Sequence, residues 1–178
     1  MYRDEVDPWG FSSREYERRK YALTIASLPR PRYRSAFEPG CSIGVLTELL
    51  AARCDDLLAT DVVPGPVEQA QKRLERFKNV TVELRAIPED WPAAMFDLVM
   101  LSEIAYYFGE SDLSCILALI AQSTEEGAHL VAVHWRGVTD YPLPGDRVHE
   151  IIGATPGFVQ LVQHVEDEFL LGVWERRR

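Results

Sequence analysis

Residues 36–47 read AFEPGCSIGVLT, and this stretch decides the fold. An apolar run ends at the acid Glu38, a loop containing Gly40 and Gly44 follows, and apolar residues then recur at helical spacing. This order is typical of a strand, a tight turn and a helix. Glycine lets the backbone take a positive φ and lets a ligand approach closely, and the start of the helix offers unpaired N–H groups. The pattern indicates a loop that holds a nucleoside, although a plain strand-to-helix turn has the same form.

A second acid strengthens the nucleoside interpretation. The run LLAT at residues 57–60 resembles a strand and ends at Asp61, 17 positions after Gly44. In a strand-helix-strand unit, an acid at the tip of the second strand lies beside the loop of the first and can accept both hydroxyls of a ribose. Asp61 also suits a cap for the helix that starts near Pro66. The two roles are compatible.

Two details separate this loop from the dinucleotide fingerprint. Glu38 stands two positions before the first glycine, where a carboxylate would repel a pyrophosphate, and the Gly40-Ser42-Gly44 spacing departs from G-x-G-x-x-G. The pattern resembles motif I of the class I S-adenosylmethionine-dependent methyltransferases, with Ser42 at the usual middle glycine. A sulfonium cofactor with an α-ammonium group suits an acidic loop because it is cationic.

The rest of the chain predicts an α/β fold with a mostly parallel seven-stranded sheet, helices on both faces and a Rossmann-like arrangement. We expect helices at 12–28 (opened by a Ser12/Glu15 capping box), 44–53, from 64–66 onward, around 113–120 and at 146–154, and strands at 35–38, 57–61, 80–84, 96–101, 130–135, 158–165 and 169–175. The last two strands are separated by only three residues, too few for a parallel crossover, so they form an antiparallel hairpin. Such a closing hairpin is the plan of the class I methyltransferases.

Length and composition bound the remaining possibilities. The 178 residues fit one domain, 1–178, with 1–30 forming an arm and helix that serve as a candidate lid. With 19 Lys and Arg against 28 Asp and Glu, the net charge of −9 argues against nucleic acid, and the basic run 14–20 is interpreted as the solvated side of a helix. Three cysteines and four histidines without ligand spacing indicate no metal and a cytoplasmic protein. We expect no membrane segment and a monomer or weak dimer.

The carboxyl ends of the strands supply the candidate chemistry. Glu103 follows the fourth strand, where it is expected to face the transferred methyl group and bind an amine or take its proton, unless it caps the next helix. His134, at the end of the fifth strand, is a second candidate base or a structural histidine. Catalytic roles are therefore assigned to Glu103 and His134.

The remaining site predictions concern the two ligands. The cofactor is expected to contact the loop, the strand ends and the candidate lid. Its adenine is expected near Ala86, at a position where many methyltransferases carry an acid. The predicted cofactor contacts are Glu38, Gly40, Cys41, Ser42, Gly44, Asp61, Ala86, Ile87, Ser102, Trp9 and Arg19. The acceptor is expected to contact a mainly aromatic wall formed by Tyr106, Tyr107, Trp135 and His149. Tyr141 is a further aromatic residue that suits this wall. These aromatic residues are otherwise interpreted as core.

Beyond motif I, the chain resembles the nodulation-protein S family of methyltransferases. The matching stretches are DPW (7–9), YERRKYA (16–22), EPGCSIGVLTELLAARCD (38–55), WP (91–92), FDLVMLSEIAYY (96–107), VHWR (133–136) and DYPLPGDRVH (140–149). The resemblance implies methyl transfer from S-adenosylmethionine to an amino group, leaving S-adenosylhomocysteine. In the named members the acceptor is the deacetylated terminal glucosamine of a chitin-type oligosaccharide, so the acceptor here is expected to be an amino sugar or small molecule. A small-molecule O-methyltransferase and a non-catalytic S-adenosylmethionine-binding protein are the alternatives.

Overall fold

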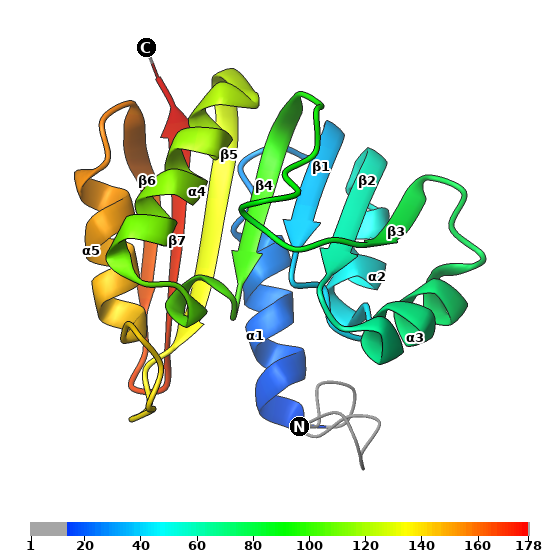
Figure 1. Cartoon of the computed structure of the whole chain (residues 1–178), viewed down its shortest axis with the longest axis horizontal. Coiled ribbons are helices and arrows are strands. Elements are labelled where there is room, and N and C mark those ends of the chain that lie inside the picture. The colour runs from blue at the N-terminus through cyan, green and yellow to red at the C-terminus, as the bar shows by residue number, and fades with distance from the viewer. Residues whose placement is uncertain (1–13, 178) are drawn as a thin grey trace.

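One seven-stranded sheet forms the centre of the protein (Figure 1). The computed structural model describes residues 14–177. Its strands lie in the order β3-β2-β1-β4-β5-β7-β6. Their bounds are β1 (Tyr33–Pro39), β2 (Cys54–Asp61), β3 (Val80–Leu84), β4 (Phe96–Ser102), β5 (Thr124–Trp135), β6 (Phe158–Val165) and β7 (Phe169–Arg176). The predicted seven-stranded Rossmann-like sheet is confirmed.

Strand direction changes only at the end of the chain. The first five strands pair in parallel, while β7 pairs antiparallel with both β5 and β6. The connection from β6 to β7 is a tight turn in which the Glu166 N–H donates to the Phe169 carbonyl at 2.9 Å. The predicted hairpin is therefore confirmed, and it inserts β7 between β5 and β6.

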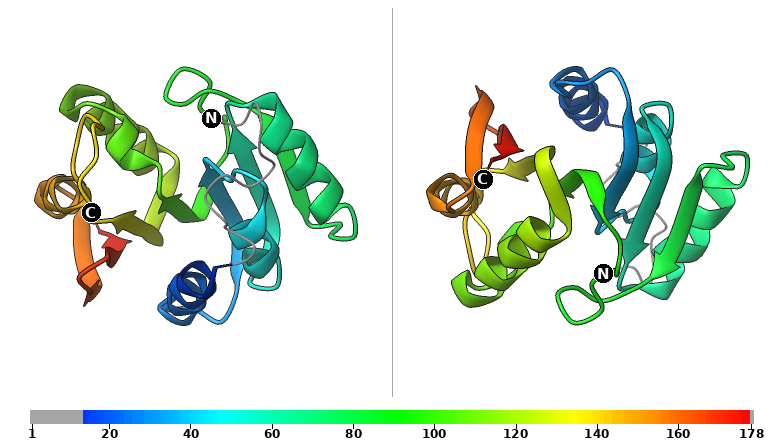
Figure 2. Two further views of the ribbon diagram at one scale, coloured as in Figure 1. Left: turned by 90° about the horizontal axis from the view of Figure 1, so that it is seen from below. Right: turned by 90° about the horizontal axis from the view of Figure 1, so that it is seen from above.

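Helices cover both faces of the sheet, as predicted. They are α1 (Glu15–Ala26), α2 (Val45–Ala51), α3 (Pro64–Leu74), α4 (Glu110–Gln122) and α5 (Gly145–Ala154), with a 3-10 turn, η1 (Ala105–Tyr107), after β4. Along β4, Leu98 and Met100 join the core under α1 and α2, whereas Val99 and Leu101 join the core under α4 and α5. Figure 2 shows α1 and α4 on opposite sides of the sheet. This alternation follows from the two-residue period of a strand and buries β4 on both faces.

The start of β5 differs most from the sequence prediction. Strand β5 begins at Thr124, six residues before the predicted start, so Gly127 lies inside the strand. The early start arises because Thr124 pairs with Phe96 across a register shift, and Gly127 takes a φ of 82° there. A capping box at Ser12 falls outside the described residues.

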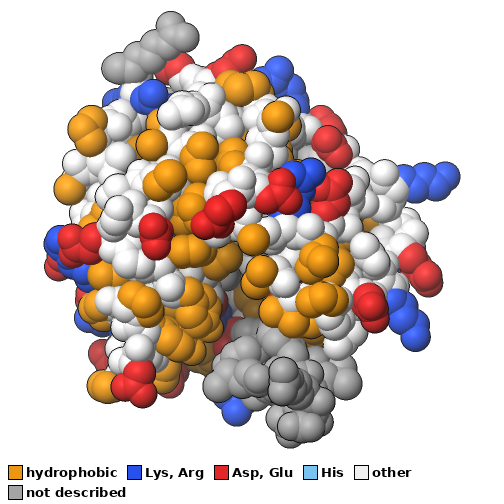
Figure 3. Space-filling view, in the orientation of Figure 1, with side chains coloured by type: hydrophobic (Ala, Val, Ile, Leu, Met, Phe, Trp, Pro, Cys, Tyr) orange, Lys and Arg blue, Asp and Glu red, His pale blue; other side chains and the backbone are white. Residues whose placement is uncertain are grey.

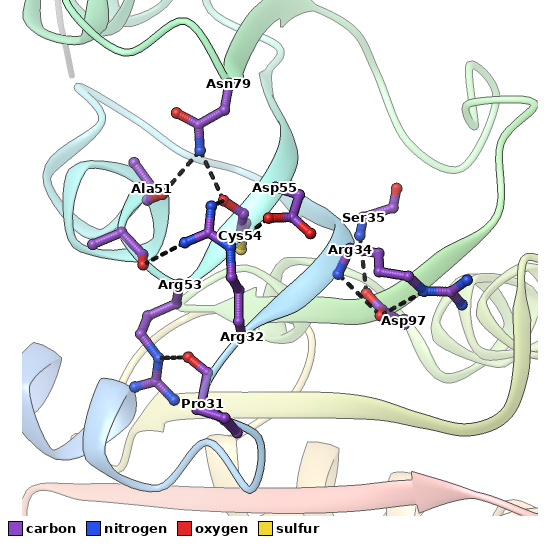
Figure 4. Close-up of polar contacts among 11 residues, drawn as sticks. Pro31, Arg32, Arg34, Ser35, Ala51, Arg53, Cys54, Asp55, Asn79 and Asp97 are labelled. Carbon is purple, nitrogen blue, oxygen red and sulfur yellow. Dashed lines mark hydrogen bonds and ion pairs between the residues drawn. The ribbon is translucent and has the colours of Figure 1, made fainter.

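The amino ends of the strands are held together by a polar cluster (Figure 4). The Asp97 carboxylate accepts the main-chain N–H groups of Arg34 and Ser35, both at 3.0 Å, and thereby joins β4 to β1. The Arg53 guanidinium donates to the Pro31 carbonyl at 2.7 Å. These side chains stabilise the fold, and a cavity lies at the opposite edge of the sheet.

Charged groups are spread over the surface. On the face shown in Figure 3, basic side chains of described residues lie scattered among acidic ones, in keeping with the net charge of −9. Within residues 14–177, none of the helices combines the length and apolar character needed to cross a bilayer.

Candidate functional site

A cavity of about 860 Å³ lies at the carboxyl ends of the parallel strands. Its wall is formed by the ends of β1, β2, β4 and β5, by the loop after β3 and by α1. In Figure 1 this is the lower edge of the sheet, toward which the arrowheads of β1 and β4 point. Ligands of open parallel sheets bind at this edge, so the topology and the cavity agree.

The glycine loop after β1 has the conformation that the sequence predicts. Gly40 has a φ of 74°, and a Cβ placed on it would lie 2.5 Å from Cδ1 of Ile104. Gly44 has a φ of 78°, and its added Cβ would lie 3.0 Å from Cδ1 of Leu74 in α3. Gly40 lines the cavity and Gly44 does not. The prediction that Gly44 contacts the cofactor is therefore not met by its position: its small size lets α2 start close against α3.

Glu38 is a buried carboxyl on the cavity wall. Its side chain is almost inaccessible, with the residue 2% exposed, and within residues 14–177 Oε2 has no hydrogen-bond partner. Burial raises the pKa of Glu38 to about 8, an effect that the Thr47 hydroxyl opposes in part. A buried acceptor without a donor is costly unless a ligand supplies one. Glu38 thus fits a cationic hydrogen-bond donor in the cavity.

Asp61 lies at the tip of β2 on the same wall. Oδ2 accepts the main-chain N–H of Ser42 and Oδ1 accepts that of Val63, each at 2.9 Å. Val63 immediately precedes α3, so the predicted capping role of Asp61 has a structural counterpart. Burial raises the pKa of Asp61, and these main-chain hydrogen bonds lower it. These contacts leave the carboxylate able to accept a further donor, such as a ribose hydroxyl.

Glu103 stands at the end of β4 in a left-handed conformation with a φ of 54°. Its Oε1 accepts from Lys20 Nζ at 2.6 Å, and its Oε2 accepts from the Tyr106 hydroxyl at 2.6 Å and from the Trp135 main-chain N–H at 2.9 Å. The carboxylate therefore receives three donors and lines the cavity. It binds its neighbours at the edge of the sheet and does not cap α4, which starts seven residues later.

Helix α1 contributes a polar inner face that the sequence analysis missed. Glu17 and Lys20, in the stretch interpreted there as solvated, are 6% and 2% exposed and line the cavity. Glu17 and Lys20 are three positions apart, and Glu17 lies one helical turn before the buried Tyr21. The helical spacing of the apolar face, continued toward the N-terminus from Tyr21, would therefore have indicated that these residues face inward.

Arg19 does not line the cavity. Its guanidinium makes a bidentate pair with Glu166 in the turn between β6 and β7, with both distances 2.7 Å. With about 3.6 residues per turn, a position next to Lys20 on the helix points about 100° away. The position of Arg19 therefore gives no support to the prediction that it contacts the cofactor. Trp9, the other residue of the candidate lid, lies outside the described residues.

The two histidines predicted near the site lie behind its wall. His134 is fully buried, its Nε2 accepts the Ala105 N–H at 3.2 Å, and its Nδ1 lies 3.2 Å from Nε2 of His149. Burial, reinforced by His149 and Lys20, lowers the pKa of His134 well below its usual value, and burial lowers that of His149 to about 4. Neither lines the cavity. These positions give no support to the predictions of His134 as a base and of His149 as an acceptor contact.

Aromatic side chains form one wall of the cavity. Tyr106 stacks with Tyr141 at a centroid distance of 5.0 Å, Tyr107 lies 4.5 Å from Tyr141, and Trp135 lines the same wall. Tyr106 is buried, whereas Tyr107 and Trp135 are 45% and 39% exposed. The wall therefore runs from the interior, beside Glu103, to the surface.

The remaining predicted residues are distributed as follows. The cavity is also lined by Cys41, Ser42, Ala86, Ile87 and Ser102. Burial raises the pKa of Cys41 well above its usual value, so its thiol stays protonated. Among the described residues, no cluster of three or more histidine, cysteine or acidic side chains suits a metal ion.

Comparison with known proteins gives a family. The model of the nodulation protein S (NodS) family matches residues 3–127. Nodulation protein S of Rhizobium tropici is 28% identical over 127 residues, covering 70% of this chain and 53% of the relative. The Bradyrhizobium diazoefficiens protein is 30% identical over 102 residues, covering 57% and 49%. The chain thus spans about half the length of the curated relatives it matches.

Solved structures share the fold over nearly the whole chain. A candidate methyltransferase from Pseudomonas syringae is 40% identical, with a TM-score of 0.82 over 92% of this chain and 100% of that one. The N-methyltransferase NodS from Bradyrhizobium japonicum WM9, solved with S-adenosyl-L-homocysteine, is 24% identical, with a TM-score of 0.88 over 98% and 94%.

Proposed function

The chain belongs to the nodulation protein S family, and we propose that it is an S-adenosylmethionine-dependent N-methyltransferase that acts on an amine of a sugar or small molecule. The observation that carries the proposal is the cavity beside the glycine loop, in which Glu38 has a buried acceptor atom with no donor from the described part of the chain. An α-ammonium group supplies that donor. A pyrophosphate supplies no donor to that atom, and it would repel the Glu38 side chain whenever that side chain is ionised.

The residues present fit the cofactor. Glu38 and the Gly40 main chain would hold its methionyl part, Asp61 its ribose hydroxyls, and Ala86 and Ile87 would pack on its adenine. Cys41, Ser42 and Ser102 complete this wall. When bound, S-adenosylmethionine supplies an electrophilic methyl group and leaves as S-adenosylhomocysteine.

The acceptor side is formed by Glu103 and the aromatic wall. The Glu103 carboxylate would bind the amine, and the rings of Tyr106, Tyr107 and Trp135 would pack on the C–H groups around it. Aromatic faces also favour the cation that an amine becomes when it is methylated. The exposed rings at the outer end of this wall leave room for a sugar, the acceptor class that the family resemblance implies.

An amine suits this site better than a hydroxyl. A hydroxyl oxygen is a weak nucleophile until a base takes its proton, whereas a neutral amine nitrogen is nucleophilic enough to attack first and release its proton after transfer. The candidate base His134 lies behind the wall, and the three donors that Glu103 receives weaken it as a base. N-methylation is therefore favoured over O-methylation.

Cellular setting is a further part of the proposal. Cys41, Cys54 and Cys115 are free, and Cys115 is exposed, which suits a reducing cytoplasm. We propose a monomer or weak dimer that does not bind nucleic acid, since the net charge is −9. Light scattering after gel filtration tests the oligomeric state.

The experiment is a pair of measurements on the purified chain. Calorimetric titration compares S-adenosylhomocysteine with NAD, and a methyl-transfer assay compares a glucosamine tetramer with its fully N-acetylated counterpart, which differs only at the amines. The proposal expects binding of S-adenosylhomocysteine alone and transfer to the free amine alone. Binding without transfer to any amine or hydroxyl would favour the non-catalytic alternative, and binding of NAD alone would overturn the proposal.

A further inference from the structure

A buried ammonium group lies where α1 meets the end of β4. Nζ of Lys20 is 2.6 Å from Oε1 of Glu103 and 3.0 Å from Oε2 of Glu17, and its side chain is 2% exposed. The same Nζ lies 4.9 Å from the centroid of the Tyr16 ring. Two carboxylates and an aromatic face therefore balance the lysine charge inside the protein.

Attaching α1 to the sheet through a buried ion pair is energetically unfavourable compared with apolar packing. Burying an ion pair costs desolvation energy, and apolar residues of similar volume often stabilise a protein as well or better. Glu103 also holds a left-handed φ of 54°, which is strained for a residue with a side chain. Both features lie on the cavity wall, where they can act on a molecule bound in the cavity.

The contacts fix the Glu103 carboxylate at both oxygens. Oε2 accepts from the Tyr106 hydroxyl and the Trp135 N–H, which fills its two lone pairs. Among the hydrogen bonds of the described residues, Oε1 accepts only from Lys20 and so keeps one lone pair. The ammonium group also stabilises negative charge on the carboxylate by Coulomb attraction.

We propose that Lys20 is a positioning residue for methyl transfer: its ammonium group orients the Glu103 carboxylate so that one Oε1 lone pair is free for the acceptor amine. This inference rests on the proposed function, because it assigns the amine to Glu103. Lys20 is not itself the acceptor, since an ammonium nitrogen carries three donors and has no lone pair to attack a methyl group.

The test compares Lys20→Met with Arg19→Met. Both changes remove a cation from α1 and break its ion pair with a carboxylate, but Arg19 pairs with Glu166 and does not line the cavity. We expect Lys20→Met to lower kcat/KM for the glucosamine tetramer by about tenfold or more while changing the Kd for S-adenosylhomocysteine by less than about threefold. Arg19→Met should change neither, and Lys20→Arg, which keeps the charge, should recover part of the loss.

Two kinetic outcomes would overturn the inference. One is a wild-type kcat/KM in Lys20→Met. The other is an equal loss in Lys20→Met and Arg19→Met, which would show that α1 docking alone matters. Thermal unfolding confirms that each variant is folded, and Lys20→Gln replaces Lys20→Met if that variant does not fold.

A second readout needs no acceptor. The carboxyl ¹³C signal of Glu103, assigned by its loss in Glu103→Gln, reports on the hydrogen bonding of the group. We expect the same signal in the wild type and in Arg19→Met, and a shifted signal in Lys20→Met, because Oε1 of Glu103 loses the ammonium group that it accepts from. The same carboxylate signal in all three proteins would overturn the inference. A wild type that does not methylate the glucosamine tetramer would instead reject that acceptor, and the ¹³C comparison would still decide the role of Lys20.

Discussion

The main-chain N–H of Ser42 donates a hydrogen bond of 2.9 Å to Oδ2 of Asp61, which ties the glycine loop after β1 to the tip of β2. The other oxygen of Asp61 accepts the Val63 N–H ahead of α3. A single carboxylate thus orders the loop and the start of a helix while it lines the cavity. Under the proposed function, the same group also binds the ribose.

Asp61→Ala should weaken binding of S-adenosylhomocysteine by about 1.5–3 kcal/mol, because charge-assisted hydrogen bonds to the ribose and to the loop are lost together. Calorimetry measures the change. Asp55→Ala is the matched control, since Asp55 is an exposed acid that pairs with Arg32 at the opposite edge of the sheet. Wild-type affinity in Asp61→Ala would reduce Asp61 to a helix cap.

Glu38→Gln should change how stability depends on pH. The pKa of Glu38 is about 8 in the folded protein against an ordinary 4.5, so between these values the folded state holds a proton that the unfolded chain has released. The free energy of unfolding therefore falls as pH rises through this window, and the Glu38 contribution is fully present only below it. Urea unfolding at about pH 5 and about pH 8 should show a smaller fall in Glu38→Gln than in the wild type.

Glu38→Gln should also change the affinity for the cofactor product. Glu38→Gln should raise the Kd for S-adenosylhomocysteine by about tenfold or more, since the ammonium group of the ligand loses its counter-ion. Binding to the wild type should strengthen as pH rises toward 8, because the ligand ammonium favours the ionised carboxylate. Equal slopes in both unfolding series, together with equal affinities, would show that Glu38 is not the group that titrates or binds.

Gly40→Ala should abolish cofactor binding and destabilise the fold by about 1–3 kcal/mol, because the new Cβ meets Ile104 and the positive φ disfavours a side chain. Gly65→Ala in α3 is the control, since nothing lies within 4 Å of its added Cβ. Alanine there should be neutral or stabilising by up to about 1 kcal/mol through helix propensity. Thermal unfolding and calorimetry check both variants, and a fully functional Gly40→Ala would contradict the role of the loop.

His134→Leu should lower stability by about 1–3 kcal/mol, because the buried Ala105 N–H loses its acceptor. The pH dependence of methyl transfer should keep its shape, because His134 does not line the cavity. Urea unfolding and a pH–rate profile measure the two effects. A lost limb of the profile in this variant would restore His134 as a base.

The order of the elements and the position of the site were predictable from local patterns. In four places a few neighbouring residues are enough to predict the structure: the glycine loop, the alternation at 80–84, the apolar run at 96–101 and the short connection before β7. Because parallel strands end at one edge, Glu38, Asp61 and Glu103 were expected on one wall, and all three line the cavity.

What the sequence did not reveal depends on contacts between distant residues. The inward face of Lys20 is set by pairing with Glu103, 83 positions later, and a charged residue on a helix normally faces water. The side chain of His134 lies on the face of β5 that packs against α5. Its position at the end of a strand does not determine which face it occupies. The start of β5 at Thr124 likewise follows from pairing with Phe96.

A crystal structure with bound S-adenosylhomocysteine would decide most directly whether this cavity is a methyl-donor site. We predict the ligand in the cavity, with its amino group within hydrogen-bond distance of Oε2 of Glu38 and its ribose hydroxyls on Asp61. Density for the ligand elsewhere, or a Glu38 carboxylate that it does not contact, would contradict the proposed function.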